Sequence, residues 1–476
     1  MLPAEHFPIQ RCTPELLLLI FEVLVDDEAS KFDPRDTLHA FKLRAAAHLA
    51  LVCKAWKELV FSSPTLWPVL VLNLEKPFHK VYDVALRYSQ LAKSAPVDVY
   101  VYTIHKHPTA HELHTISECA STVENITILF SLIDKIRALQ IHFHAELASV
   151  SAITEVWSRR SSIIELRYMI SGWPQPVQDI PLATQVEYLP FLTYLWINCA
   201  GSIRMPKHTS TPLLPNLRKL YIMTSSLPMQ TSQLGLLLSH CPRLEEIDST
   251  LGKCLFDDIS QLSSILLPKL RKITTHAVKP FTDLFRAGVL KLSALESFSS
   301  IQTMNTAESD DLSGLLQQND RLTSLYLSVN GVSAYGNLVH SIKNLQYLFL
   351  HGTGDGQFLR PLFTPLSATD TSQPTLPHLG PSLSMTIMVA RATIHQEHFS
   401  DLVAARFVPV NARGETIAGC PAITELKLLF ISRASVLKEI EGTDLWKAAD
   451  VTFDPSDTSC RLRWTYRPND VQETSV

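Results

Sequence analysis

The sequence predicts an α/β protein in which a short helical module precedes a solenoid, with parallel strands on the concave side and helices outside. Three observations carry this prediction. The 476 residues include 70 leucines and only 15 glycines. A six-residue pattern of spaced apolar residues recurs about every 26 residues over most of the chain. The first 70 residues instead carry helix-start signals and denser apolar runs.

Composition excludes several classes of protein. The net charge is −4 without a basic block, which argues against a nucleic-acid partner. Apolar runs such as 16–21 fall short of the ~20 residues of a membrane helix, and Glu5, Glu15 and Glu22 do not fit a signal peptide. The eight cysteines form no CxxC pair, so we expect reduced thiols rather than disulfides or structural zinc. These features favour an intracellular protein, cytoplasmic or nuclear or both.

The first predicted helix begins at Thr13 or Pro14. Threonine can cap free backbone N–H groups, proline fits the first helical position, and Glu15 lies at the positive end of the helix dipole. Residues 16–21 are apolar around the whole circumference of this helix. Two different surfaces must therefore cover it, and one of them can belong to a partner.

A second helix is predicted over residues 45–59. Ala45, Leu49, Val52, Trp56 and Leu59 recur at helical spacing, with charged residues on the opposite face. The sequence Ser-Ser-Pro at 62–64 ends this helix, because proline biases the preceding residue away from helical geometry. A strand is predicted over 69–74.

In order and spacing, these segments resemble the F-box motif. The sequences PELL..IF at 14–21, LVCKAWKEL at 51–59 and SPTLW at 63–67 are most similar to the leucine-rich F-box proteins that are abundant in mushroom-forming fungi. That resemblance implies docking on a Skp-type adaptor through residues at the matching positions: Pro14, Leu16, Leu17, Ile20, Phe21, Leu24, Leu49, Val52, Cys53, Trp56, Leu59 and Trp67.

The resemblance implies a function as well. In this family the adaptor links the F-box protein to a cullin, so the chain would be the substrate-recognition subunit of an SCF-type ubiquitin ligase, with no catalysis of its own. Two departures stand out: residues 11–14 replace the usual Leu-Pro, and the link over 26–43 is longer than usual. A helical pair that packs only internally, and a non-ligase scaffold with a degenerate F-box, are the alternatives.

A pattern of the form LxxLxL repeats from residue 136 onward. Copies span 136–141, 163–168, 192–197, 217–222, 244–249, 270–275, 295–300, 322–327, 345–350 and 423–428. Steps of 23 to 29 residues separate the first nine starts, within the range typical of leucine-rich repeats. The final step of 78 residues is interpreted as three periods of 26. Each unit should provide one strand and one helix, as in the helix expected over 233–240.

These patterns divide the chain into four parts: the F-box with its insertion (1–68), an irregular start of the array (69–135), the leucine-rich solenoid (136–445), and a C-terminal cap and tail (446–476). In the irregular start we expect a helix over 81–91, a strand over 97–103 and a helix over 126–136. Later we expect a surface loop near 360–381, a strand over 385–389 and a helix over 398–406.

The residues between the spaced leucines should face outward from the concave sheet. These positions hold two aromatic groups, Tyr194, Trp196 and Tyr221, then Tyr326, Tyr347 and Phe349. Charged residues such as Glu246, Asp248 and Lys272 lie between the groups in sequence. We expect the aromatic groups to bind a protein substrate, because exposed aromatic side chains dominate interface energetics. The alternative is that the aromatic residues are simply good strand formers, or that the loops cover them.

Motifs that suggest catalysis or cofactors are incomplete. His105, His107, His111 and His114 are dense, but their spacing is not HExxH and no further ligands complete a site. The sequence GTGDG at 352–356 lacks phosphate-loop spacing, and no GxSxG is present. We therefore expect no metal, no cofactor and no enzymatic activity.

Overall fold

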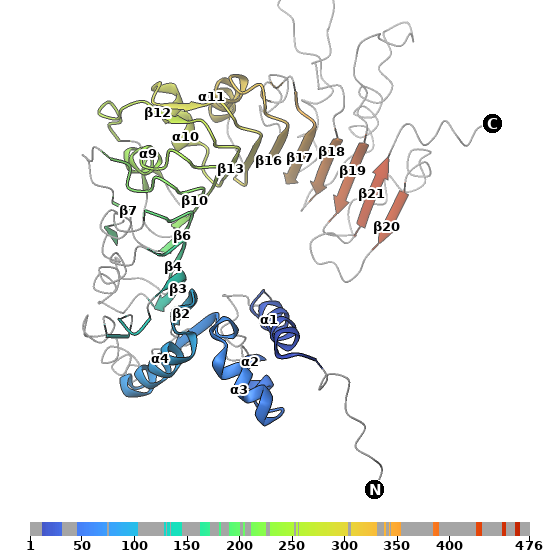
Figure 1. Cartoon of the computed structure of the whole chain (residues 1–476). Helices are drawn as coiled ribbons and strands as arrows, with labels where there is room; N and C mark the ends of the chain where they lie inside the picture. The colour runs from blue at the N-terminus through green and yellow to red at the C-terminus, as the bar shows by residue number, and fades with distance from the viewer. Residues whose placement is uncertain are drawn as a thin grey trace, which may run out of the picture. The chain divides into compact units, whose positions relative to one another are not determined.

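The structure is a computed structural model (Figure 1). It describes residues 12–30, 45–73, 76–102, 128–129, 131–133, 135–144, 162–171, 180–181, 190–199, 203–204, 211–224, 229–251, 254–255, 257–302, 306–330, 338, 342, 344–353, 384–389, 425–430, 450–453 and 462–466. The chain forms two compact units, unit 1 over Met1–Leu227 and unit 2 over Pro228–Val476.

Unit 1 opens with a helical module. It contains α1 (Pro14–Ser30), α2 (Ala45–Leu49), α3 (Lys54–Ser62) and the 3₁₀ turn η3 (Pro64–Leu66). The single helix expected over 45–59 is wrong, because Cys53 is extended, with φ −159° and ψ 170°. Its Sγ accepts a hydrogen bond from the backbone N–H of Trp56 at 3.5 Å, so Cys53 caps a new helix instead of continuing the old one.

Six parallel strands follow in the described part of unit 1. Their order in the sheet is β1 (Val69–Asn73), β2 (Val97–Tyr102), β3 (Ile136–His144), β4 (Glu165–Ser171), β6 (Tyr194–Cys199) and β8 (Lys219–Thr224). The helix α4 (Phe78–Ala92) connects β1 to β2. The two-residue strands β5 (Ile180–Pro181) and β7 (Ile203–Arg204) pair separately. The strands expected over 69–74 and 97–103 and the helix expected over 81–91 are confirmed to within a few residues.

Unit 2 continues the pattern with its own run of strands. The parallel strands are β10 (Glu246–Leu251), β13 (Lys272–Thr275), β15 (Ser297–Ser300), β16 (Ser324–Asn330), β17 (Tyr347–Thr353), β18 (Ser384–Val389) and β19 (Glu425–Phe430). Antiparallel β21 (Leu462–Tyr466) and β20 (Asp450–Phe453) end the sheet. Two short parallel pairs lie outside it: β9 (Met229–Gln230) with β11 (Cys254–Leu255), and β12 (Ile265–Leu267) with β14 (Leu290–Leu292).

Three helices of unit 2, α9 (Thr231–Ser239), α10 (Lys279–Arg286) and α11 (Thr306–Gln317), lie together beside this run of strands (Figure 1). The helix expected over 233–240 is confirmed as α9. Leu234, Leu237 and Leu238 of α9 and Phe281 of α10 are buried. These helices therefore pack on one another and on the short strands β9, β12 and β14 through buried apolar side chains.

Each copy of the LxxLxL pattern coincides with a strand, and equivalent apolar residues lie in register on neighbouring strands. Leu195 pairs with Leu220 and Ile197 with Ile222, and all four are buried. Their neighbours along each strand face the other side of the sheet, which we call the open face. The described residues are thus α/β with parallel strands in repeat order, compatible with a solenoid.

Three weaker copies place a hydroxyl where the third apolar residue is expected. Ser249, Thr275 and Ser300 are register neighbours and fully buried. Ser249 Oγ donates to Thr275 Oγ1 at 3.0 Å, and Thr275 Oγ1 donates to the Ala277 carbonyl at 2.8 Å. Ser300 Oγ donates to the Gln302 carbonyl at 2.9 Å. Buried hydroxyls that are hydrogen-bonded in this way can replace leucine without an unpaired polar group.

Two further expectations differ from the structure. Residues 128–129 and 131 are helical, but Ile136 begins β3 rather than ending a helix, because its backbone pairs with β2. The interpretation of the 78-residue step as three periods is wrong, since β18 pairs directly with both β17 and β19. The strand expected over 385–389 is confirmed as β18, whereas the loop near 360–381 and the helix over 398–406 lie outside the described residues.

Candidate functional site

The helical module of unit 1 has its own apolar core. Leu17, Phe21 and Val25, spaced four residues apart on α1, are buried against residues of α3 and η3 such as Val60 and Leu66. Phe21 is fully buried, and the Trp56 ring meets it edge to face with centroids 4.7 Å apart. This stripe of α1 therefore fixes the helix within the module.

The start of α1 follows the predicted capping chemistry. Thr13 Oγ1 accepts a hydrogen bond from the backbone N–H of Leu16 at 3.4 Å. Hydrogen bonds from its own backbone N–H and from the Thr13 hydroxyl hold the pKa of Glu15 below its usual value. The anion at the helix start thus persists to lower pH than an ordinary glutamate.

A second stripe of α1 is solvent-exposed although it is entirely apolar. We call this set the apolar stripe; it consists of Leu16, Leu19, Ile20, Val23 and Leu24, with exposed fractions from 41% at Ile20 to 68% at Val23. In the turn between α2 and α3, Leu51 and Val52 of the same module are also exposed, by 82% and 60%. Exposed apolar side chains gathered on one element mark an interaction surface in soluble proteins.

The twelve residues expected to contact an adaptor fall into two groups in the structure. Pro14, Leu16, Ile20, Leu24, Val52 and Cys53 are exposed, whereas Leu17, Phe21, Leu49, Trp56, Leu59 and Trp67 are buried or packed against the module's core. The first group can touch a partner directly. The second group holds the first in place.

Sequence reasoning missed three of the most exposed apolar residues, Leu19, Val23 and Leu51. A helical wheel of α1 places Leu19 and Val23 on the same face as the predicted contact residues Leu16 and Ile20. Positions 17, 21 and 25 share one face of a helix, and positions 16, 19, 20 and 23 lie on another. Nothing in the apolar run itself says which face becomes the core.

Trp67 joins the helical module to the helix α4. Its indole Nε1 donates to the Val60 carbonyl at 3.1 Å, and its ring stacks on Phe61 with centroids 5.9 Å apart. Its other contact is an edge-to-face arrangement with Tyr88 of α4 at 6.1 Å. This tryptophan thus makes contacts in α3 and in α4, which lie on opposite sides of β1 in the sequence.

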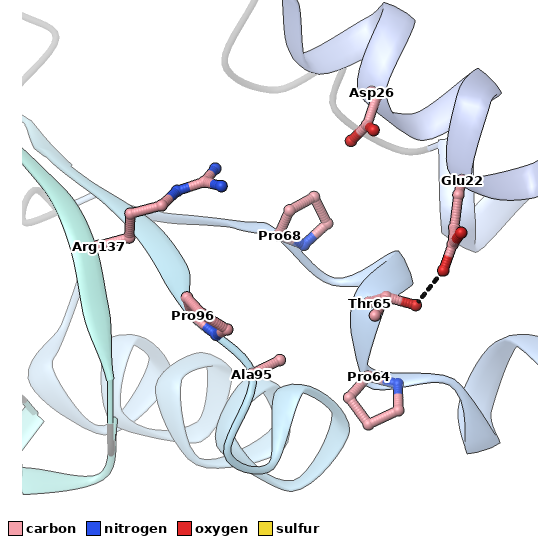
Figure 2. Close-up of a pocket in the computed structure, with 8 residues that line it drawn as sticks. All are labelled: Glu22, Asp26, Pro64, Thr65, Pro68, Ala95, Pro96 and Arg137. Carbon is pink, nitrogen blue, oxygen red and sulfur yellow. Dashed lines mark hydrogen bonds between the residues drawn. The ribbon is translucent and has the colours of Figure 1, made fainter.

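A pocket of about 300 Å³ lies where this module meets the start of the sheet (Figure 2). Its lining residues are Glu22, Asp26, Pro64, Thr65, Pro68, Ala95, Pro96 and Arg137. Thr65 Oγ1 donates to Glu22 Oε1 at 2.7 Å, and Arg137 is bound to Asp98 through two hydrogen bonds. Glu22 and Arg137 are thus already hydrogen-bonded within the fold, and none of the eight lining residues is a histidine or cysteine.

The first aromatic group lies on the open face of unit 1. Tyr194 and Trp196 of β6 are half-buried, and Tyr221 of β8 is 38% exposed. Trp196 is the register partner of Tyr221, and the rings of Tyr194 and Tyr221 are 6.3 Å apart. These three side chains form one contiguous aromatic surface.

The second aromatic group lies on the open face of unit 2. Tyr326 of β16 and Phe349 of β17 are register partners whose rings stack at 4.4 Å with an interplanar angle of 8°. Burial raises the pKa of Tyr326 above its usual value. Tyr347 is 59% exposed and lies opposite Ser324. A partner of unit 2 would therefore contact a flat aromatic surface with a small serine beside it.

Charged residues lie on the open faces of both units. In unit 2, Glu246 lies beside Lys272 in register, as expected for the charged stretch. In unit 1, the guanidinium carbon of Arg167 lies 5.1 Å from the centre of the Tyr194 ring. Sequence reasoning did not single out Arg167, because the register that places it beside Trp196 depends on loops of unequal length.

Within the ranges that the structure describes, no three His, Cys, Asp or Glu side chains gather in a metal-binding arrangement, and no helix is long and apolar enough to cross a membrane. The histidines at 105–114 lie outside those ranges. Cys12, Cys53 and Cys241 carry free thiols.

The chain matches no protein-family model and is similar to no curated protein.

Proposed function

We propose that the chain is a substrate-recognition subunit of an SCF-type ubiquitin ligase, in which the helical module docks on a Skp-type adaptor and through it on a cullin. The observation that carries this proposal is the apolar stripe of α1. The helix buries Leu17, Phe21 and Val25 in its own module, yet keeps five further large apolar side chains exposed. A helix of a monomeric protein gains nothing from a second apolar face unless a partner covers it.

The energy that the apolar stripe can supply is adequate for stable docking. Burying a large apolar side chain completely is worth about 1.5 to 3 kcal/mol. Since the five side chains are already partly covered, about half of that gain remains for each. The stripe therefore offers roughly 4 to 8 kcal/mol before the costs of association, and Leu51 and Val52 add to it.

The open faces of the sheet would hold the protein substrate. In this proposal Tyr194, Trp196 and Tyr221 of unit 1, together with Tyr326, Tyr347 and Phe349 of unit 2, supply aromatic anchors. The chain itself performs no chemistry. It raises the effective concentration of the target near the transferring subunits, which is a proximity effect. Such an assembly would operate in the cytoplasm, the nucleus or both.

Capture of a recombinant Skp-type adaptor by the full chain tests the proposal. Wild type should retain the adaptor, and Leu19→Ser combined with Val23→Ser should lose it, because both side chains are exposed and absent from the module's core. Val84→Ser is the matched control, since Val84 is a 48% exposed valine on α4. Failure of wild type to retain any adaptor would refute the ligase function and favour a leucine-rich scaffold.

A further inference from the structure

Residues on the open face of unit 1 form regular rows across the strands. The register of five strand pairs aligns one row near the centre of the sheet, which we call the middle row. It runs through Val71, Tyr100, Gln140, Arg167, Trp196 and Tyr221. A polar and cationic half thus continues directly into the aromatic group.

Among the residues that the structure describes, Gln140 has a buried acceptor without a donor. The residue is 6% exposed, and its Oε1 accepts no hydrogen bond from this part of the chain. Leaving a buried acceptor unpaired costs about 1 to 3 kcal/mol, so native proteins rarely keep one without a purpose. Gln140 belongs to the open face, between Tyr100 and Arg167 in register, so a change of its side-chain rotamer presents this acceptor to a molecule bound there.

Two arginines near this row differ in how many of their N–H donors are hydrogen-bonded. Arg137 binds both carboxylate oxygens of Asp98, at 2.8 and 2.7 Å. Arg167 approaches Glu165 only at 3.8 Å, which is longer than a hydrogen bond, and is held instead against the Tyr194 ring. The planar fork of Arg167 therefore retains donors for a bidentate acceptor.

The surrounding charges select the kind of anion. Glu165 and Asp98 lie close enough to Arg167 and Tyr100 to act on the same tyrosine hydroxyl, whose pKa burial and Asp98 raise to about 12. Arg137 and Asp98 neutralise each other, and so do Arg167 and Glu165, so a dianion bound here would carry twice the uncompensated charge of a monoanion. A carboxylate thus fits this surface better than a phosphate does.

We propose that the middle row of unit 1 binds an acidic segment of a partner protein. A glutamate or aspartate of that segment pairs with Arg167, a main-chain N–H donates to Gln140 Oε1, and an apolar side chain packs on Trp196 and Tyr221. Two strand spacings separate Gln140 from Trp196, about 10 Å, which roughly three residues of extended chain span. The inference rests on the proposed function in one respect, because both take the open face as the surface that binds a protein.

Fluorescence polarisation with labelled nine-residue peptides tests it. The peptides carry one Glu and one Trp separated by zero to two alanines, each with a Gln counterpart. For at least one spacing, the Glu peptide should bind wild type about tenfold tighter than its Gln counterpart, with the difference shrinking in high salt. Arg167→Gln should abolish this preference. The charge-neutral pair Asp98→Asn with Arg137→Gln, on the same face, should retain it.

Gln140→Leu separates a binding role from a structural one. We expect both Glu and Gln peptides to lose affinity about fivefold or more, while the thermal midpoint of the protein does not fall, since an unpaired acceptor is removed. A lowered midpoint with unchanged binding would assign Gln140 a structural role and overturn its part in the site.

Further results would contradict parts of the proposal or of the ligase function. Equal binding of Glu and Gln peptides at every spacing, or a preference that survives Arg167→Gln, would refute the inference. Phosphoserine peptides that bind more than tenfold tighter than Glu peptides would refute the choice of a monoanion. Adaptor capture by the same preparations is measured in parallel. Loss of capture would count against the ligase function alone, because the middle row shares no residue with α1.

Discussion

Thr275 is the position at which the packing of unit 2 can be tested most quantitatively. Its hydroxyl accepts from Ser249 Oγ at 3.0 Å and donates to the Ala277 carbonyl at 2.8 Å, and Ser249 and Thr275 are fully buried. Thr275→Val keeps the shape of the side chain but leaves a buried hydroxyl and a carbonyl without partners. At about 1 to 3 kcal/mol for the buried hydroxyl and less for the carbonyl, we expect a loss of about 2 to 4 kcal/mol.

Hydrogen exchange of the amides in β10, β13 and β15 measures this loss locally, which matters because a chain of two units need not unfold in one step. Protection should fall by about 30-fold to several hundred-fold. Thr275→Ser, which loses only a methyl group, should cost about 1 kcal/mol. Thr274→Val on the open face should change protection little. A loss for Thr275→Val no larger than for these two controls would refute the hydroxyl network as the reason for the weak repeats.

Three further predictions follow from the packing and ionisation of unit 1 and unit 2. Phe21→Ala should destabilise the helical module by about 3 to 5 kcal/mol, against less than about 1 kcal/mol for exposed Leu16→Ala, in urea denaturation followed by tryptophan fluorescence. Burial raises the pKa of Tyr100 from its usual value of 10 to about 12, so between these values only the unfolded chain loses this proton. The free energy of unfolding should therefore fall as pH rises through this window, and Tyr100→Phe should flatten that fall. A thiol reagent should modify exposed Cys53 rapidly and fail to modify Cys241 before unfolding, because Cys241 is fully buried and burial raises its pKa.

The strand positions could be predicted from the sequence because they follow from one physical requirement. Residues such as Leu195 and Ile197 must alternate with outward residues for the sheet to bury one face, and this alternation survives even where Ser249 replaces an apolar residue. The aromatic residues Trp196 and Tyr221 could be placed on the open face by the same argument. Predicting which face they occupy requires only that side chains alternate between the two faces of a strand.

The site itself could be predicted only in part. The apolar run of α1 covers the whole circumference of the helix, so its pattern does not show whether Phe21 or Leu19 is buried. That choice depends on Trp56, which lies more than thirty residues away in the sequence and packs on Phe21. The break at Cys53 was hidden because apolar residues keep helical spacing through it. Gln140 and Arg167 are neighbours on adjacent strands because of the strand register. That register is set across loops of different length, which no local sequence pattern encodes.

Site-resolved alkylation of Val23→Cys in the full chain, with and without a saturating Skp-type adaptor, tests the central claim most directly. Val23 is 68% exposed on the apolar stripe, so the introduced thiol should react readily in the free chain. The adaptor should slow that reaction at least about tenfold and leave Val84→Cys on α4 unaffected. Equal rates at position 23 with and without bound adaptor would contradict docking through α1.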